Sequence, residues 1–327
     1  MRALVEERPG VAYLAAMSIA HSFHVGGLRC FTLEGGRQRL DGGAMFGVVP
    51  RTLWSRRIPP DERNRIPLGL RCLLVEHPDG LVLIDTGLGN KEDQKFLDIY
   101  GVENLGSSGP TQLEDSLLDI GYKPDEVKWV INTHLHFDHA GGNTTSPALP
   151  LSGNGEGERP VELAFPNATY VVQKKELEFA RNTNERTRAS YLSHNFDPVD
   201  VQGRWKLIEG NVDVLPGISV RLTPGHVPFH QSVVVEDQGE TAVFLGDVMP
   251  TAAHLPLPWI MGYDLEPLRT LESKRALVNE AADRHWRFVF EHDPTVAFGT
   301  VRREGKDVSL VNVVTAPLGK VPALPAT

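Results

Sequence analysis

The stretch Thr133-His134-Leu135-His136-Phe137-Asp138-His139 decides how this sequence folds and what it can bind. It follows residues 127–132, an apolar run that predicts a buried strand ending just before His134. Imidazole and carboxylate groups are the usual non-thiolate ligands of zinc and similar ions. Histidine is an uncommon residue. Three histidines and an aspartate within six residues are therefore not expected at an ordinary polar strand end. We therefore predict a metal site at the carboxyl end of this strand.

Three further ligand candidates follow apolar runs later in the chain. His226 closes Thr223-Pro224-Gly225-His226, directly after a predicted strand at residues 218–222. Asp247 follows the apolar run 241–245, and His292 follows the run 286–290. A buried carboxylate without a partner would be costly, and a metal ion offsets that cost. Each of these three side chains is therefore a further metal-ligand candidate.

These segments, taken in order, resemble the metallo-β-lactamase superfamily. The matching pieces extend from about residue 26 to residue 300 and comprise His-x-His-x-Asp-His at 134–139, Asp-Thr-Gly at 85–87, Thr-Pro-Gly-His at 223–226, Gly-Asp at 246–247 and Glu-His-Asp at 291–293. The resemblance implies an α/β protein folded as an αββα sandwich, with the metals at one edge between the two sheets.

The resemblance also implies how the site works. The six terminal ligands divide between two ions, the first held by His134, His136 and His226 and the second by Asp138, His139 and His292. Asp247 bridges the ions together with a hydroxide, which serves as the nucleophile, and Asp138 also passes a proton to the leaving group. Asp85 hydrogen bonds a ligand histidine and so orients it. We expect two divalent ions, zinc in the first place, with iron, manganese or cobalt as alternatives.

The domain organisation follows from interleaved strand and helix patterns. We predict one metallo-β-lactamase-like domain over residues 18–327, preceded by a loosely ordered extension at residues 1–17 and interrupted by a Gly/Pro/Ser-rich inserted loop at about 146–162. The longest helical pattern covers residues 268–284, and its predicted buried face comprises Leu268, Leu271, Val278, Ala281 and Ala282. The chain then closes with strands rather than with helices.

Composition limits the partners. The 327 residues carry a net charge of −9, which argues against nucleic acid or an anionic membrane as the main partner. No apolar run approaches the ~20 residues that span a bilayer, and acidic residues precede the one weak apolar segment near the start. We expect a cytoplasmic protein that acts on a small molecule, with a homodimer as one alternative. Cys30 and Cys72 are expected to be buried free thiols, a disulfide between them being the alternative.

Within the superfamily the sequence resembles the N-acyl-homoserine lactone lactonases and the methyl-parathion hydrolases. Residues 42–50 and 256–264 carry this narrower resemblance. The expected substrate-binding residues are Met45, Phe46, Phe137, Phe229, His254 and Tyr263. The sequence departs from the best-known lactonases at one position. Those enzymes have a tyrosine there that contacts the lactone, and this sequence has Pro250. Tyr263 or His254 are the candidates to replace that tyrosine.

The function predicted from these observations is hydrolysis at a dinuclear metal site, with opening of an N-acyl-homoserine lactone-like ring as the first choice. The alternatives are an aryl phosphotriester hydrolase on the same site, a mononuclear iron persulfide dioxygenase, and a protein on this fold that binds a ligand without catalysis. Metal identity and stoichiometry discriminate the dioxygenase from the hydrolases. An activity panel discriminates the hydrolases from one another.

Overall fold

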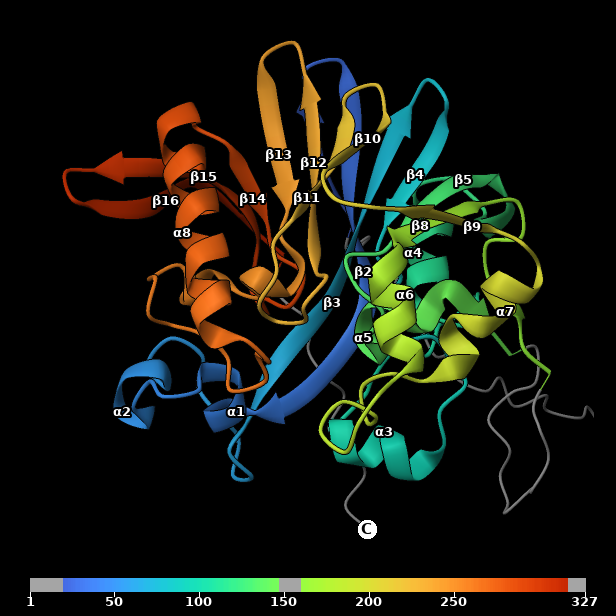
Figure 1. The fold of residues 1–327 in the computed structure, drawn as a ribbon, viewed down its shortest axis with the longest axis horizontal. Helices are drawn as coiled ribbons and strands as arrows, with labels where there is room; N and C mark the ends of the chain where they lie inside the picture. The colour runs from blue at the N-terminus through green and yellow to red at the C-terminus, as the bar shows by residue number, and fades with distance from the viewer. Residues whose placement is uncertain (1–19, 147–159, 317–327) are drawn as a thin grey trace, which may run out of the picture.

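Two seven-stranded sheets face each other in the computed structural model, which describes residues 20–146 and 160–316 (Figure 1). The first sheet has the strand order β1 (His21–Val25), β2 (Leu28–Asp41), β3 (Arg65–His77), β4 (Gly80–Ile84), β5 (Val127–Ile131), β8 (Thr169–Gln173) and β9 (Trp205–Ile208). The second has the order β10 (Val212–Leu215), β11 (Ile218–Leu222), β12 (Gln231–Asp237), β13 (Glu240–Phe244), β14 (Arg287–Val289), β15 (Val296–Glu304) and β16 (Asp307–Thr315). A two-residue pair, β6 (Thr144–Thr145) and β7 (Glu162–Leu163), lies apart.

The main core lies between the two sheets. Alternating side chains of the first sheet, such as Leu73 and Ile131, pack against those of the second, such as Val233 and Phe244, and all four are fully buried. Burying one such side chain contributes roughly 1.5–3 kcal/mol relative to leaving it exposed. Strand β5 runs through this core, so its carboxyl end, where the metal motif begins, is held on both faces.

Helices cover the outer faces of both sheets. Helix α4 (Gln112–Asp119) buries Leu113 and Leu117 against the first sheet, and α8 (Pro267–Arg284) buries Leu277 and Val278 against the second. Figure 1 shows α8 on one side of the paired sheets and α4, with α6 (Lys174–Arg181), on the other. The order helix, sheet, sheet, helix confirms the αββα sandwich expected from the resemblance.

Most predicted elements are present, and several short ones were not anticipated. Strands β15 and β16 confirm that the described chain closes with strands. The pattern did not reveal α1 (Gly42–Phe46), α2 (Arg51–Trp54), α3 (Gln94–Tyr100), the one-turn α5 (Phe137–Ala140) or α7 (Asp197–Val201). Helices of four to seven residues show too few turns for a period of 3.6 to be recognised. The extension 1–17 and residues 147–159 of the inserted loop lie outside the described residues.

Two composition-based expectations can be compared with the structure directly. Cys30 and Cys72 are both free and buried, which agrees with the thiol expectation and not with the disulfide alternative. Within residues 20–146 and 160–316, no helix is both long and apolar enough to cross a membrane.

Candidate metal centre

The end of β5 and the turn after it present the first ligands. Thr133, His134 and Leu135 continue the chain from the strand, and α5 starts directly after His136. Asp138 and His139 therefore lie on a helical turn, where they point to a different place from His134 and His136. The turn closes at Gly141 and Gly142, where an added Cβ atom would collide with the carbonyl oxygens of Leu88 and Thr86. Only glycine permits this close approach to the turn that contains Asp85.

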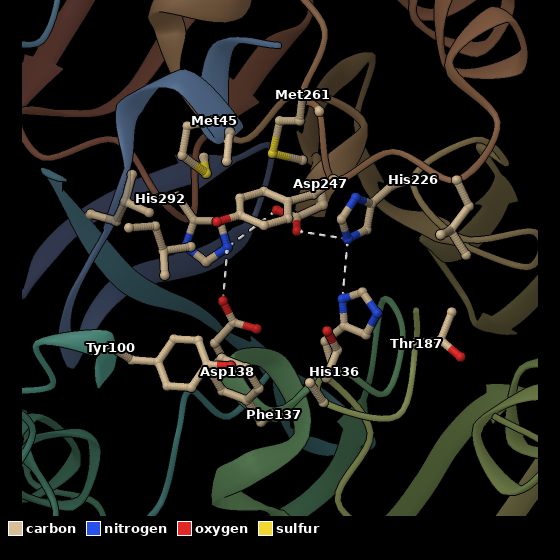
Figure 2. A pocket seen from close by; sticks show the side chains of 18 of the residues that line it. Met45, Tyr100, His136, Phe137, Asp138, Thr187, His226, Asp247, Met261 and His292 are labelled. Carbon is tan, nitrogen blue, oxygen red and sulfur yellow. Dashed lines mark hydrogen bonds and ion pairs between the residues drawn. The ribbon is translucent and has the colours of Figure 1, made fainter. Parts of the chain in front are cut away.

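The first cluster is formed by one atom each of His134, His136, His226 and Asp247, all within 4.8 Å of one another. The loop after β11 brings His226, and the short turn after β13 brings Asp247. His226 Nε2 lies 3.1 Å from His136 Nδ1 and 3.1 Å from Asp247 Oδ2 (Figure 2). Four donors from three separate segments thus converge on one point.

The second cluster is formed by Asp138, His139 and His292, again within 4.8 Å. His292, which follows β14, places its Nε2 atom 3.1 Å from His139 Nε2 and 3.1 Å from Asp247 Oδ1. Asp247 therefore directs its two oxygens to different clusters, as Figure 2 shows from the dashed lines to His226 and His292. This is the arrangement that a bridging carboxylate needs.

The donor set fits two divalent ions. His134 Nε2 is buried and has no hydrogen-bond partner, which is costly unless another group takes that place. Two pairs of imidazole nitrogens face each other at 3.1 Å, and a shared cation explains why lone pairs converge in this way. Nitrogen and oxygen donors without a thiolate suit zinc and harder divalent ions.

Electrostatics within the clusters agree with metal binding. Burial lowers the pKa values of His134 and His136 well below the usual range, so both imidazoles are neutral and offer lone pairs. Burial alone would also lower the pKa of His292, but the Asp247 carboxylate outweighs it and raises that pKa to about 9. A cation would take the place of the His292 proton, and for this reason we expect metal binding to release protons.

Carboxylates hold the outer nitrogens of His139 and His226, and the carbonyl oxygen of Gly69 lies 2.8 Å from Nδ1 of His292. His139 Nδ1 lies 3.0 Å from Asp85 Oδ2 and 2.9 Å from Glu291 Oε2, and His226 Nδ1 lies 3.0 Å from Asp264 Oδ1. Such partners fix the tautomer and the orientation of the ring. Asp85 also accepts hydrogen bonds from the backbone N and Oγ1 of Thr133, both at 2.7 Å. The role expected for Asp85 thus has the required geometry.

Several residues beyond the ligand candidates support the centre, and Asp264, Glu291 and Gln38 among them escaped the sequence analysis. Asp264 and Glu291 lie inside quoted segments, but no spacing rule distinguishes them from other acids. Gln38, on the long strand β2, donates a hydrogen bond to Asp138 Oδ2. His230 Nε2 accepts a hydrogen bond from the backbone N of Asp247 at 3.0 Å, and burial lowers the pKa of His230 to about 3, so this ring is a neutral acceptor.

A cavity of about 400 Å³ opens above the two clusters. Its floor contains five of the seven ligand candidates: His136, Asp138, His226, Asp247 and His292. Three of the predicted substrate-binding residues line its wall, namely Met45, Phe137 and Tyr263. Tyr100, Met261 and Arg186 also line the wall and were not anticipated.

The other three predicted substrate-binding residues do not line the cavity, which corrects the expectation. Phe46 is fully buried in the core beside the cavity, stacked between Trp54 at 5.3 Å and His254 at 4.6 Å. His254 is also buried, and its ring nitrogens contact Thr251 Oγ1 and the carbonyl oxygen of Met45, both at 2.8 Å. Phe229 packs beside Phe179 of α6. Phe46 and His254 are thus part of the core, whereas Phe229 is half-buried outside the cavity lining. Pro250 has no hydroxyl to offer at the position of the lactone-contacting tyrosine, and Tyr263 remains the candidate to replace it.

Comparison with known proteins agrees with this geometry. Residues 66–292 match the model of the metallo-beta-lactamase superfamily. An N-acyl homoserine lactonase of Bacillus thuringiensis is 32% identical over 179 residues, which cover 53% of this chain and 61% of that protein. The chain therefore spans about three fifths of the length of these curated relatives.

Solved structures extend the similarity. A probable metal-dependent hydrolase from Staphylococcus aureus has a TM-score of 0.79 and 28% identity, and the match covers 92% of this chain and 100% of that one. The structure of an N-acyl homoserine lactone hydrolase, with N-hexanoyl-L-homoserine bound at its catalytic metal centre, has a TM-score of 0.59 and 25% identity. That match covers 83% of this chain and 94% of the other.

Proposed function

Since the chain belongs to the metallo-beta-lactamase superfamily, we propose that it is a dinuclear metal-dependent hydrolase that opens lactone rings. The observation that carries the proposal is Asp247, whose two oxygens face two histidine clusters beneath a partly apolar cavity. The similarity to N-acyl homoserine lactonases over part of the chain supports a lactone as substrate.

The seven ligand candidates would hold the two ions, His134, His136 and His226 one of them, and Asp138, His139 and His292 the other, with Asp247 between them. When bound, such a pair supplies Lewis-acid activation of water and of the ester carbonyl. Asp85 and Asp264 would keep His139 and His226 in the tautomers that leave Nε2 free to bind.

Asp138 and Tyr263 are the proposed proton-handling and substrate-contacting residues. Asp138 lies on the cavity floor, and the Gln38 side chain donates a hydrogen bond to one of its oxygens. Its carboxylate would take up the proton released when water attacks the ester carbonyl and would pass that proton to the leaving alkoxide. Burial raises the pKa of Tyr263 to about 12, so its hydroxyl keeps its proton at neutral pH. A protonated phenol in the wall can donate a hydrogen bond to a substrate oxygen.

Aryl phosphotriester cleavage is the second candidate function. The observation that favours it is the aromatic part of the wall, where Tyr100 and Phe137 lie 4.7 Å apart between ring centroids. Such a surface suits an aryl leaving group. The same ligands and the same floor would serve this reaction, so the two functions differ in substrate and not in machinery.

Elemental analysis and a substrate panel test the proposal together. The purified, metal-loaded protein should contain close to two metal ions per chain. Among lactones, aryl phosphotriesters, β-lactams and thioesters, lactones should give the highest kcat/KM and phosphotriesters a weaker side activity. A single iron with activity retained would contradict the dinuclear site. Brisk thioester or β-lactam cleavage without lactone turnover would contradict the substrate class.

A further inference from the structure

The two sides of the cavity differ in chemistry. Met45, Leu68 and Met261 form an apolar wall, whereas Arg186, Thr187 and Ser190 form a polar one. Figure 2 shows Met45 near His292 and Thr187 on the other side, near His136 and His226. A substrate that fills the cavity would therefore meet apolar groups at one end and hydrogen-bonding groups at the other.

Among the described residues that line the cavity, Arg186 is the only arginine or lysine. Its Nη2 atom donates a hydrogen bond to the carbonyl oxygen of Gly262 at 3.0 Å. No carboxylate within residues 20–146 and 160–316 forms an ion pair with it. Since a guanidinium has five N–H donors, most of them remain available to a ligand at the cavity rim.

The backbone around Arg186 is held in place. Asn184 Oδ1 accepts hydrogen bonds from the backbone N of Arg186 at 2.9 Å and of Thr187 at 3.2 Å. The carbonyl oxygen of Ser190 accepts a hydrogen bond from the backbone N of Phe137, at the start of the metal-binding turn, at 2.9 Å. The loop that carries Arg186 is thus tied to the metal centre, and the bond to Gly262 ties its side chain to the opposite rim. A donor held in this way loses little freedom when it binds a ligand.

We infer that Arg186 is a specificity-determining residue, which binds an oxygen acceptor on the substituent of the lactone ring. The inference rests on the proposed function and states which ring substituent that site selects. An amide carbonyl and a carboxylate both provide such an oxygen, and both suit the planar guanidinium. The remaining apolar part of the substituent would lie along the wall formed by Met45, Leu68 and Met261. Lactones with an oxygen-bearing substituent are therefore preferred over plain alkyl lactones.

Three lactones of equal chain length test the inference on the metal-loaded full-length protein: one with an acylamino substituent, one with a carboxylate-bearing substituent and one with a plain alkyl chain. The variant Arg186→Met keeps the aliphatic stem and removes the donors. We expect kcat/KM of Arg186→Met to fall about 10- to 100-fold for the oxygen-bearing lactone that the wild type prefers. Most of this fall should come from a higher KM. For the alkyl lactone, kcat/KM should change less than about threefold. Arg186→Lys should restore part of the loss, because it returns the charge without the fork.

Arg188→Met is the matched control, because Arg188 is exposed on the same loop and does not line the cavity. Its selectivity should equal that of the wild type. An equal loss on all three lactones, or no loss on any, would overturn the inference. Inhibition constants of matched acylamino, carboxylate-bearing and alkyl lactams need no turnover and give the same comparison. If the wild type opens no lactone, the proposed function fails, and the lactam series still decides the role of Arg186.

Discussion

Asp247 directs one oxygen toward His226 and the other toward His292, so both clusters depend on this one residue. Asp247→Ala should lower the occupancy of both metals, and turnover should fall by two or more orders of magnitude. The fold should persist, because the core between the sheets does not include this side chain. Elemental analysis and kcat/KM measure the effect, with the exposed Asp213→Ala as control. Near-normal metal content in the variant would show that Asp247 does not bridge.

Substitution of Tyr263 tests whether its hydroxyl contacts the substrate. Tyr263→Phe removes only the hydroxyl, which stays protonated at neutral pH because burial raises its pKa to about 12. We expect kcat on a lactone to fall roughly 10- to 100-fold, the order found when one donor to a developing oxyanion is lost. Metal content and thermal stability should match the wild type. Tyr122→Phe is the control, because Tyr122 does not line the cavity. Equal activities in both variants would exclude a contact through the Tyr263 hydroxyl.

Phe46 shows how a residue beside a cavity differs from one that lines it. Its ring is fully buried between Trp54 and His254, so truncation leaves a void in the core. Phe46→Ala should lower the free energy of unfolding by about 3–5 kcal/mol. Chemical denaturation measures the loss, and Val48→Ala, at a residue 93% exposed, is the control. A variant that keeps its stability but prefers a different acyl chain length would instead indicate that Phe46 contacts the substrate.

At the scale of elements, helix α8 shows what periodicity predicts and what it misses. The pattern placed Val278, Ala281 and Ala282 on the buried face, and the structure agrees. It also placed Leu268 there, but Leu268 is 76% exposed, while Lys274 is buried. Lys274 Nζ donates hydrogen bonds to the carbonyl oxygens of Pro256 at 2.8 Å and Trp259 at 2.7 Å. A lysine can occupy an apolar face when backbone acceptors satisfy its ammonium group, and no helical pattern encodes their position.

Lys274→Met should destabilise the loop that carries Met261, Tyr263 and Asp264. Each carbonyl left buried without a donor costs about 1–3 kcal/mol. Burial lowers the pKa of Lys274 to about 7, whereas a lysine of an unfolded chain titrates near ~10.4. Between these values the unfolded chain binds more protons, so the contribution of Lys274 to wild-type stability rises from about pH 7 to about pH 10.

Urea denaturation of wild type and Lys274→Met across this pH range measures the effect. The stability difference in favour of the wild type should grow as the pH rises. The exposed neighbour Arg275→Met should show no such trend. If the stability difference between wild type and Lys274→Met shrinks from pH 7 to pH 10, the lowered pKa of Lys274 is contradicted.

At the scale of the whole molecule, the ligand candidates tie the two sheets together. Residues 134–139 follow β5 of the first sheet, whereas His226, Asp247 and His292 follow strands of the second. Each ion that only the folded chain binds stabilises it by about 2.7 kcal/mol when the free concentration of the ion is 100 times Kd. For a chain of this size, chelation should lower the melting temperature by roughly 5–10 °C.

Differential scanning calorimetry with and without a chelator measures this shift, and added zinc should restore the original value. Asp247→Ala should show a smaller shift, because less metal is bound at the start. An unchanged melting temperature of wild type after complete metal removal would mean that the clusters form without any contribution from the ions.

The sequence by itself determined the order of the ligand candidates, the strands that precede them and the resemblance to the family. These features are written in short segments: six residues suffice for the motif at 134–139, and the five mostly apolar residues of β5 suffice for the strand that ends before it. The resemblance to the superfamily indicated that His226, Asp247 and His292 belong with that motif, and each of them follows a predicted buried strand. The predicted sandwich then followed from the resemblance.

The tertiary structure alone decided which side chains support and surround the centre. Asp264 lies 38 residues after His226 in the chain and orients its ring. Glu291 lies beside His139, and no local sequence pattern relates these two positions. Arg186 reaches Gly262 on the opposite rim, and Phe46 turns into the core while its neighbour Met45 lines the cavity. Local periodicity reports which face of an element is buried. It cannot report which element covers that face, because packing between distant segments sets that choice.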